Sequence, residues 1–213
     1  DRFTSQSLAP MVFVPGGLGK LTADELSRVL TGKIYGAGFS IDGDAYQLSG
    51  ATRPADLQLQ MQVMAAYLTD PGLRPAPFEQ IKAVLPQFVA QQRATPGGAF
   101  AIDGAGYLAS GDKREIFPPA DVIAAFTLDE LKQGVTQGMA SGPIDIVMVG
   151  DVTVDDAVAA VASTFAALPT RAPAAQPLTG SDQRRFPAPT AQPIRLTHAG
   201  PAEQGLAYIA WPT

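Results

Sequence analysis

The side chains best suited to catalysis or metal binding are scarce in this chain. Its 213 residues include a single histidine, His198, and no cysteine. Histidine and cysteine are the usual nitrogen and sulfur ligands of zinc, and histidine is the most common general base. A two-histidine zinc site therefore cannot be built within the chain, and a disulfide framework is excluded. His198 stands beside a Pro/Gly turn, which is typical of a hydrogen-bonded surface residue, and its role stays open.

Two short motifs match known functional patterns only in part. Val14–Leu21 contains three glycines and Lys20, but it lacks both the first glycine of a phosphate-binding loop and the Ser or Thr that follows the lysine. Ser110 and Lys113 have the Ser-x-x-Lys spacing of penicillin-recognising enzymes, yet the Gly-Asp pair between them favours a loop over the helix that those enzymes use. We interpret both stretches as turns.

Carboxylates provide the remaining candidate chemistry. Asp151, Asp155 and Asp156 cluster after a predicted strand, but they do not alternate as in a calcium loop. The last two are expected in the first turn of a helix, where the dipole stabilises negative charge by roughly 0.3–1 kcal/mol. An enzyme that used carboxylates alone would need a close pair, and no such pair stands out among the scattered acidic residues Glu25, Asp44, Asp56, Glu79, Asp103, Asp112, Glu115 and Asp121.

The composition describes a folded chain with little attraction for nucleic acid. Hydrophobic residues make up 46% of the sequence and charged residues 16%, which is enough apolar material for a core. The net charge of −5 argues against a dedicated nucleic-acid binder, because such proteins usually carry a basic face. No apolar run approaches the length of about 20 residues that a membrane span requires.

Helix signals recur along the chain. Residues 8–14 are almost wholly apolar and predict a buried helix or strand, and Thr22–Glu25 and Thr127–Glu130 are capping boxes. Further helices are expected at about 76–93, 99–109 and 153–167, and Pro86 should kink or interrupt the first of them. The clearest amphipathic helix has its apolar face at Leu57, Met61, Met64 and Leu68.

Strand signals occupy two places before a proline-rich segment. Residues 33–50 carry β-forming side chains around Asp42-Gly43-Asp44, which predicts a hairpin, and Ile144–Asp151 predicts a single strand that ends in a turn. Six prolines then fall within 169–193, which is typical of an extended linker. The strand-forming residues 194–196 and 206–211 follow it, and we expect them to open a further domain.

Three stretches together resemble the pitrilysin/insulinase family of zinc metallopeptidases, which includes the mitochondrial processing peptidases. The most specific is a strand, Gly-Asp-Val, a helix and Leu-Pro, over Ile146–Pro169. The others are Leu48–Gln60 continued by Ala66–Gly72, and His198–Gln204 followed by Trp211-Pro212. The resemblance implies an α+β fold, a mostly antiparallel sheet with packed helices as in the mitochondrial processing peptidase. It also implies three regions: a degenerate peptidase domain at 1–168, the linker at 169–193, and the first strands of a truncated domain at 194–213.

Active domains of this family carry His-x-x-Glu-His on a helix, where the histidines bind zinc and the glutamate is the general base. The resemblance matches this helix to residues 7–14, with Pro10 and Val14 at the histidine positions and Phe13 at the glutamate position. The distal ligand falls near Ala90 or Gln91. None of these side chains can hold zinc or move a proton, so the resemblance implies no catalytic residue, no metal and no cofactor in this fragment.

The resemblance therefore predicts a non-catalytic, substrate-enclosing domain of a larger zinc-dependent metallopeptidase. Zinc is expected in the catalytic half of the parent protein, on the same polypeptide or on a homologous subunit, and peptides are the expected substrates. The alternative is a structural or assembly module of the same fold without a peptidase role. Family members of this bacterial type are often exported, which makes a periplasmic location an expectation of the resemblance alone.

Overall fold

The chain folds into two compact units. The computed structural model describes residues 3–42, 45–174 and 185–211. The larger unit comprises Leu8–Glu79 and Thr127–Gln176, and the smaller unit comprises Asp1–Ser7, Gln80–Phe126 and Pro177–Thr213. This division differs from the three regions expected from the sequence, whose boundaries stay a prediction.

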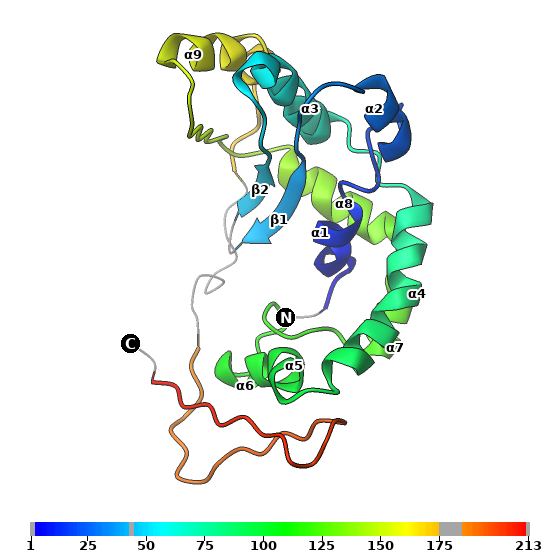
Figure 1. The fold of residues 1–213 in the computed structure, drawn as a ribbon, viewed down its shortest axis with the longest axis vertical. Coiled ribbons are helices and arrows are strands. Elements are labelled where there is room, and N and C mark those ends of the chain that lie inside the picture. Colours follow the sequence, from blue (N-terminus) through cyan, green and yellow to red (C-terminus); the bar gives the residue numbers. More distant parts are fainter. Residues whose placement is uncertain (1–2, 43–44, 175–184, 212–213) are drawn as a thin grey trace. The chain divides into compact units, whose positions relative to one another are not determined.

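A two-stranded antiparallel sheet lies in the larger unit. Strands β1 (Gly38–Asp42) and β2 (Ala45–Ser49) pair with Gly38 opposite Ser49 and Ile41 opposite Tyr46, and they run side by side in Figure 1. The hairpin predicted for residues 33–50 is thereby confirmed, although its turn residues Gly43 and Asp44 lie outside the described residues. Together with the surrounding helices, this antiparallel sheet confirms the α+β class.

Four aromatic rings form the centre of this unit. Phe13, which follows helix α1 (Ala9–Val12), stacks on Phe39 of β1 with 4.0 Å between ring centroids and lies 5.7 Å from Tyr67. Phe39 in turn stacks on Tyr46 of β2 at 5.9 Å. Such contacts add about 0.5–1.5 kcal/mol per pair to the effect of burial alone. The apolar run at 8–14 therefore forms a buried helical turn. Of the two predicted structures, a buried helix or a buried strand, the helix is the one observed.

The two tyrosines extend this aromatic group to backbone groups farther away. The Tyr67 hydroxyl donates to the carbonyl of Val14 at 3.2 Å, and the Tyr46 hydroxyl to the carbonyl of Gly134 at 3.4 Å. Burial raises the pKa of both tyrosines, so the phenols stay neutral and act as donors. Gly138 allows the approach of Tyr46, because a Cβ there would overlap the tyrosine ring.

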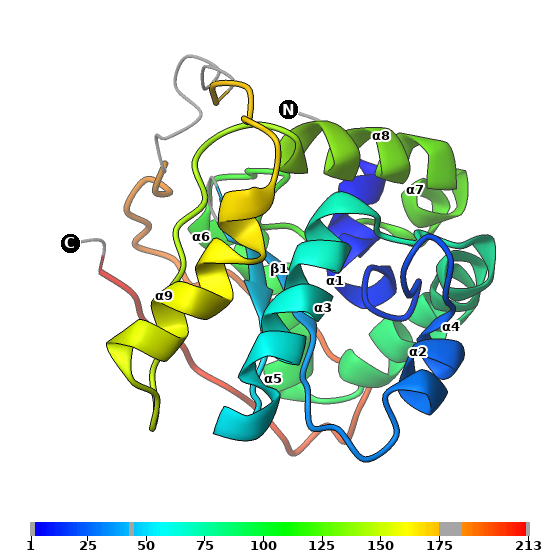
Figure 2. The ribbon, with the colours of Figure 1, turned by 90° about the horizontal axis from the view of Figure 1, so that it is seen from above.

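Helix ends in the larger unit follow the capping signals of the sequence. Thr22 and Glu25 form a complete capping box, and Thr127 and Thr153 each accept a hydrogen bond from the amide three residues later. Figure 2 shows α3 (Leu57–Thr69) and α9 (Val154–Ala162) side by side, and Gln58 Nε2 donates to the hydroxyl of Ser163 between them at 3.1 Å. The helices that these caps begin are α2 (Ala23–Val29), α8 (Leu128–Met139) and α9 (Val154–Ala162), which is followed by η4 (Phe165–Ala167).

Helix α3 (Leu57–Thr69) contains all four predicted apolar positions but buries a different face. Met61 is buried as expected, whereas Leu57, Met64 and Leu68 are only half-buried. The fully buried positions are Gln60, Met61, Val63 and Tyr67. The predicted face is therefore wrong, because the helix turns a polar side chain and a tyrosine inward.

Gln60 is buried because it takes the place of a neighbouring strand. The amide of Gly36 donates to Gln60 Oε1 and Gln60 Nε2 donates to the carbonyl of Gly36, both at 2.8 Å. Thr52 completes the pattern by donating to the carbonyl of Ile34 at 2.5 Å. The side chains of Gln60 and Thr52 thus form the hydrogen bonds that a neighbouring strand would otherwise form with the backbone leading into β1.

The smaller unit is helical, with one long helix followed by short ones. Helix α4 (Pro75–Gln92), whose first residues belong to the larger unit, continues through Pro86. Of the two predicted outcomes, a kink or a break, the break therefore does not occur; proline removes only one helical hydrogen bond, and the flanking turns maintain the rest. The helix expected at 99–109 includes a π-helical turn. The remaining elements are η1 (Ser5–Leu8), η2 (Pro54–Asp56), α5 (Pro96–Ala99), η3 (Phe100–Gly104), α6 (Ala105–Leu108) and α7 (Ala120–Ala125), of which η2 lies in the larger unit.

The strands expected at Ile144–Asp151, 194–196 and 206–211 are not formed. In the described residues, none of the three segments is part of a helix or of a sheet. Strand-forming residues favour an extended backbone locally, whereas a strand also needs a hydrogen-bonded neighbour, and propensity cannot provide one. These predictions were wrong for that reason.

Replacing Gln60 tests its role as a substitute for a strand. Gln60→Leu should lower the free energy of unfolding by roughly 1–3 kcal/mol, because the amide and carbonyl of Gly36 lose their partners. Gln62 lies on the exposed face of the same helix, and Gln62→Leu should change stability by less than about 0.5 kcal/mol. Urea unfolding of both variants measures the difference, and equal losses would contradict the role given to Gln60.

Candidate functional site

The positions matched to the zinc motif lie on and after α1. Pro10 is exposed at the start of the helix, Phe13 is completely buried, and Val14 is half-buried. Phe13 contacts Phe39 and Tyr67, so the position matched to the catalytic glutamate is part of the aromatic core. An ionised carboxylate at this position would lie among aromatic rings, and the hydroxyl of the nearby Tyr67 already donates to the carbonyl of Val14.

The positions matched to the distal ligand lie on α4. Ala90 and Gln91 are both exposed and belong to the smaller unit, whereas residues 10–14 belong to the larger one. Ala90 lines a small cavity of about 120 Å³ whose other walls are mostly proline and apolar side chains. Among the described residues, no group of three or more His, Asp or Glu side chains is placed to hold a metal ion.

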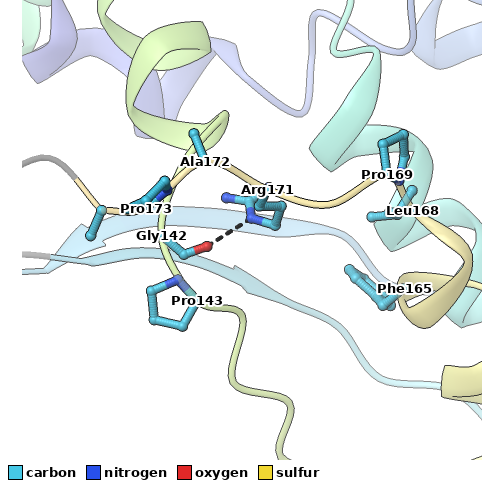
Figure 3. A pocket seen from close by; sticks show the side chains of 9 residues that line it. Gly142, Pro143, Phe165, Leu168, Pro169, Arg171, Ala172 and Pro173 are labelled. Atoms are coloured by element: carbon cyan, nitrogen blue, oxygen red, sulfur yellow. Dashed lines mark hydrogen bonds between the residues drawn. The ribbon is translucent and has the colours of Figure 1, made fainter.

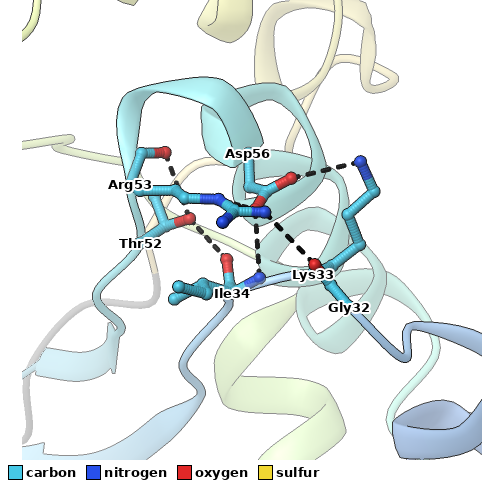
Figure 4. A network of polar contacts seen from close by, with 6 residues as sticks. All are labelled: Gly32, Lys33, Ile34, Thr52, Arg53 and Asp56. Atoms are coloured by element: carbon cyan, nitrogen blue, oxygen red, sulfur yellow. Dashed lines mark hydrogen bonds and ion pairs between the residues drawn. The ribbon is translucent and has the colours of Figure 1, made fainter.

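A buried carboxylate forms the most connected polar cluster of the larger unit (Figure 4). Asp56 accepts hydrogen bonds from the amide of Ile34 at 3.0 Å and from Nε of Arg53 at 2.6 Å, and it pairs with Lys33 at 3.3 Å. Arg53 also donates to the carbonyl of Gly32 at 3.2 Å. The Ile34 amide, with the two cations, holds the pKa of Asp56 below its ordinary value of 3.8, against the opposing effect of burial. A carboxylate held in this charged form ties the chain before β1 to α3 and is a poor general acid.

The glycine-rich stretch Val14–Leu21 is a closed turn. Its amides are used within the fold: Leu18 donates to the carbonyl of Leu21 at 2.8 Å, and Gly19 to that of Asp70 at 2.8 Å. Arg74 donates to the carbonyls of Gly16, Leu18 (2.7 Å) and Gly19 (3.1 Å). A phosphate cradle needs free amides that point at the ligand, whereas this loop directs its carbonyls toward a cation.

Ser110 and Lys113 do not form a catalytic pair on a helix. Ser110 follows α6 with a φ of 52°, in a turn that continues into Gly111. The Lys113 ammonium lies 4.3 Å from the centre of the Phe3 ring. Between them, Asp112 pairs with Arg114 at 2.6 Å, which lowers the pKa of Asp112 to about 2. The motif is a surface turn, as its composition predicts.

The remaining polar candidates have structural partners of their own. Asp103 pairs with Arg93 at 2.5 Å, and Asp155 and Asp156 lie in the first turn of α9 as expected. Both ring nitrogens of His198 contact backbone: the amide of Gly200 donates to Nδ1 at 3.1 Å, and Nε2 lies 3.0 Å from the carbonyl of Gln204. Asp44 lies outside the described residues.

The larger cavity is built around an arginine that sequence reasoning did not identify. It encloses about 440 Å³, and Arg171 lies among prolines and Phe165 in its wall (Figure 3). Arg171 donates to the carbonyls of Met139, Ser141 and Gly142 at 2.7–2.8 Å and so closes the C-terminal end of α8. The guanidinium is held by backbone, which leaves the cavity without a free acid or base. No local signal marks Arg171, because its three partners lie about 30 residues earlier in the chain.

Phe13 can be tested as a core residue. Phe13→Ala should cost roughly 3–5 kcal/mol of unfolding free energy, because it removes the ring that contacts both Phe39 and Tyr67. Phe88, which is 47% exposed on α4, is the matched control, and Phe88→Ala should cost far less. Denaturant unfolding of the two variants compares them, and a small loss for Phe13→Ala would show that the rings are not the core.

Asp56 should make the free energy of unfolding depend on pH in the acidic range. Its pKa is lowered in the folded chain, so its contribution is complete above its ordinary pKa of 3.8 and is lost as the pH falls through the lower folded value. Asp56→Asn should therefore be less stable than wild type at neutral pH, and the difference should shrink below pH 3.8. Asp145→Asn, at an exposed position outside any helix, should not change this profile. Unfolding measured across this pH range would refute the role of Asp56 if the gap stayed constant.

Similarity searches find relatives by structure only. The sequence matches no known protein family and no curated protein significantly. Three solved structures share the fold. They are a mutant of the ferredoxin protease FusC in complex with Arabidopsis ferredoxin (TM-score 0.63, 17% identity), the periplasmic protease PqqL from Escherichia coli (0.59, 22%) and a protease from Helicobacter pylori (0.59, 14%).

The match covers most of this chain but only part of each protease. It includes 82%, 92% and 88% of the chain, in the order given, but 19%, 21% and 46% of the three proteins. At these identities the similarity establishes the fold alone. In the described part of the chain, no helix combines the length and apolar character needed to cross a bilayer. The chain has the fold of a domain of the insulinase/pitrilysin-type proteases, as the sequence resemblance predicted.

Proposed function

We propose that this chain is a non-catalytic domain of a larger zinc-dependent peptidase, in which it helps to enclose peptide substrates while another half cuts them. The observation that carries the proposal is Phe13. The side chain at the position matched to the catalytic glutamate is completely buried and stacks on Phe39. A helix that supplies the centre of the core cannot also present a base to a water molecule.

The proteases of similar fold support the peptide-related role. Each of the three structures is a protease, and one of them is in complex with a protein, ferredoxin. This chain spans about a fifth of two of them and just under half of the third, which fits one domain of a larger enzyme. Zinc would then be held by the other half, since the described residues here offer it no cluster of ligands.

A structural or assembly module is the second candidate. It is favoured by the large apolar side chains that the smaller unit exposes near its C-terminal end: Ile194, Leu206, Tyr208, Ile209 and Trp211. A permanent partner that covered them would explain their exposure without any peptide substrate.

Complementation separates the two candidates. The chain, the zinc-bearing half of the parent protein, and their mixture are each incubated with a fluorogenic unstructured peptide. We expect hydrolysis from the mixture only, lost on addition of a chelator. Equal cleavage by the zinc-bearing half alone would refute the enclosing role, and a stable complex that cleaves nothing would favour the assembly module.

The core variants provide matched controls for this assay. Phe88→Ala should complement the zinc-bearing half as well as wild type does, whereas Phe13→Ala should not, because it destabilises the fold. Stoichiometric zinc bound to the chain alone, with proteolysis that a chelator abolishes, would contradict the proposal outright.

A further inference from the structure

Two stretches of the larger unit, the end of α8 and the residues after η4, are joined by hydrogen bonds of their own. The amide of Gly142 donates to the carbonyl of Ala172 at 2.9 Å, and Ser141 and Ala172 form a parallel β-bridge. Arg171 donates from Nε to the carbonyl of Gly142 at 2.8 Å and from Nη2 to those of Met139 and Ser141, each at 2.7 Å. The cavity of about 440 Å³ between these stretches is therefore preformed, as small-molecule sites usually are.

The guanidinium in the wall of this cavity has a charge that no described residue neutralises. Its three carbonyl partners are neutral, and none of the carboxylates that the structure describes pairs with it. The second terminal nitrogen of Arg171, Nη1, donates to no described group, and the side chain is half-buried. A desolvated charge of this kind gains from an anionic partner, because charge-assisted hydrogen bonds are roughly twice as strong as neutral ones. Nη1 is thus a donor suited to a carboxylate oxygen.

The other walls determine what the carboxylate must carry. Arg171 is the only charged residue of the lining, and Figure 3 shows its side chain among apolar neighbours. These neighbours are Pro143, Phe165, Leu168, Pro169 and Pro173. Proline rings are rigid and have no backbone N–H, so a phosphate would leave most of its oxygens without a donor. A flat apolar group would instead pack against the proline rings and the ring of Phe165.

We propose that this cavity binds a carboxylate attached to an aromatic or branched apolar group, with Nη1 of Arg171 as the donor to the carboxylate. A free aromatic acid and the C-terminal residue of a peptide share this chemistry. The inference goes beyond the proposed function and does not depend on a zinc-bearing half, because every residue that it uses lies in the larger unit of this chain.

The binding experiment uses the 213-residue chain alone, labelled with ¹⁵N, and follows the amide signals of Gly142 and Ala172 with the Nε–H signal of Arg171. The probe is phenylpropionate. Phenylpropanamide lacks its charge and acetate lacks its ring. We expect phenylpropionate to bind roughly tenfold or more tightly than either control, because only this probe satisfies both the guanidinium and the apolar walls. Equal affinity for the amide or for acetate, or no binding of phenylpropionate, would overturn the proposal.

A second pair of probes distinguishes the two sources of the carboxylate. A short peptide that ends in phenylalanine is titrated with a free C-terminal carboxylate and again with a C-terminal amide. If the free-acid peptide binds as tightly as phenylpropionate and the amide does not, the ligand is a chain terminus. If phenylpropionate binds and neither peptide does, the ligand is a free acid. Binding of both peptides with equal affinity would contradict the role of Arg171.

Two substitutions test the two halves of the site. Arg171→Gln removes the charge and should abolish the preference for phenylpropionate over its amide. Ala174→Trp fills the cavity from an exposed position that makes none of the Arg171 bonds, and it should weaken binding at least about tenfold. Arg195→Gln, at an exposed position of the smaller unit, is the matched control and should bind as wild type does.

The variants remain decisive if one of them fails to fold. Arg171→Gln also loses the bonds that close α8, so urea unfolding is measured first; if this variant is unfolded, Ala174→Trp decides alone. A folded Arg171→Gln that keeps the preference for the acid would refute the proposal, and so would unchanged binding in Ala174→Trp. Because no measurement here uses proteolysis, failure of this site would leave the complementation result intact.

Discussion

The stack of Phe13 on Phe39 is the contact on which the larger unit depends. It joins the turn after α1 to β1, and through Tyr67 and Tyr46 it reaches α3, β2 and the backbone of α8. Elements distant in sequence thereby share one desolvated cluster. A two-stranded sheet is only marginally stable alone. The packing of the aromatic cluster against β1 and β2 supplies the stability that the sheet lacks.

Around this cluster, side chains repeatedly satisfy backbone groups that a larger sheet would satisfy. Gln60 pairs with both polar groups of Gly36, and Asp56 accepts from the amide of Ile34. Arg74 and Arg171 each bind three carbonyls, at the glycine-rich turn and at the end of α8. These polar side chains are thus needed for folding, because a buried backbone group without a partner costs about 1–3 kcal/mol. This explains why so much of the charge in the larger unit is structural.

The sequence predicted features that depend on a few neighbouring residues. The capping threonines at 22 and 127 and the presence of a helix over Leu57–Leu68 follow from local patterns, and so does the antiparallel hairpin. Prediction from the sequence failed where the structure of a residue depends on partners that are distant along the chain. Gln60 looks like a surface residue until its bonds to Gly36 are known, and Arg171 gives no signal without the end of α8. The apolar run at 144–149 has every property of a strand except a neighbour. For the candidate site, the sequence resemblance located Phe13 correctly on a helical turn, but only packing shows why that position holds an aromatic ring.

Packing and catalysis compete for the same turn of α1. A glutamate at position 13 would need water and a metal beside it, whereas the phenylalanine there needs neighbouring rings and no water. A glutamate at position 13 would therefore require new contacts for Phe39 and Tyr67 as well as added ligands. Residues 144–149 take no part in this cluster: they form no backbone hydrogen bond with another described residue, and Val147 and Val149 are exposed.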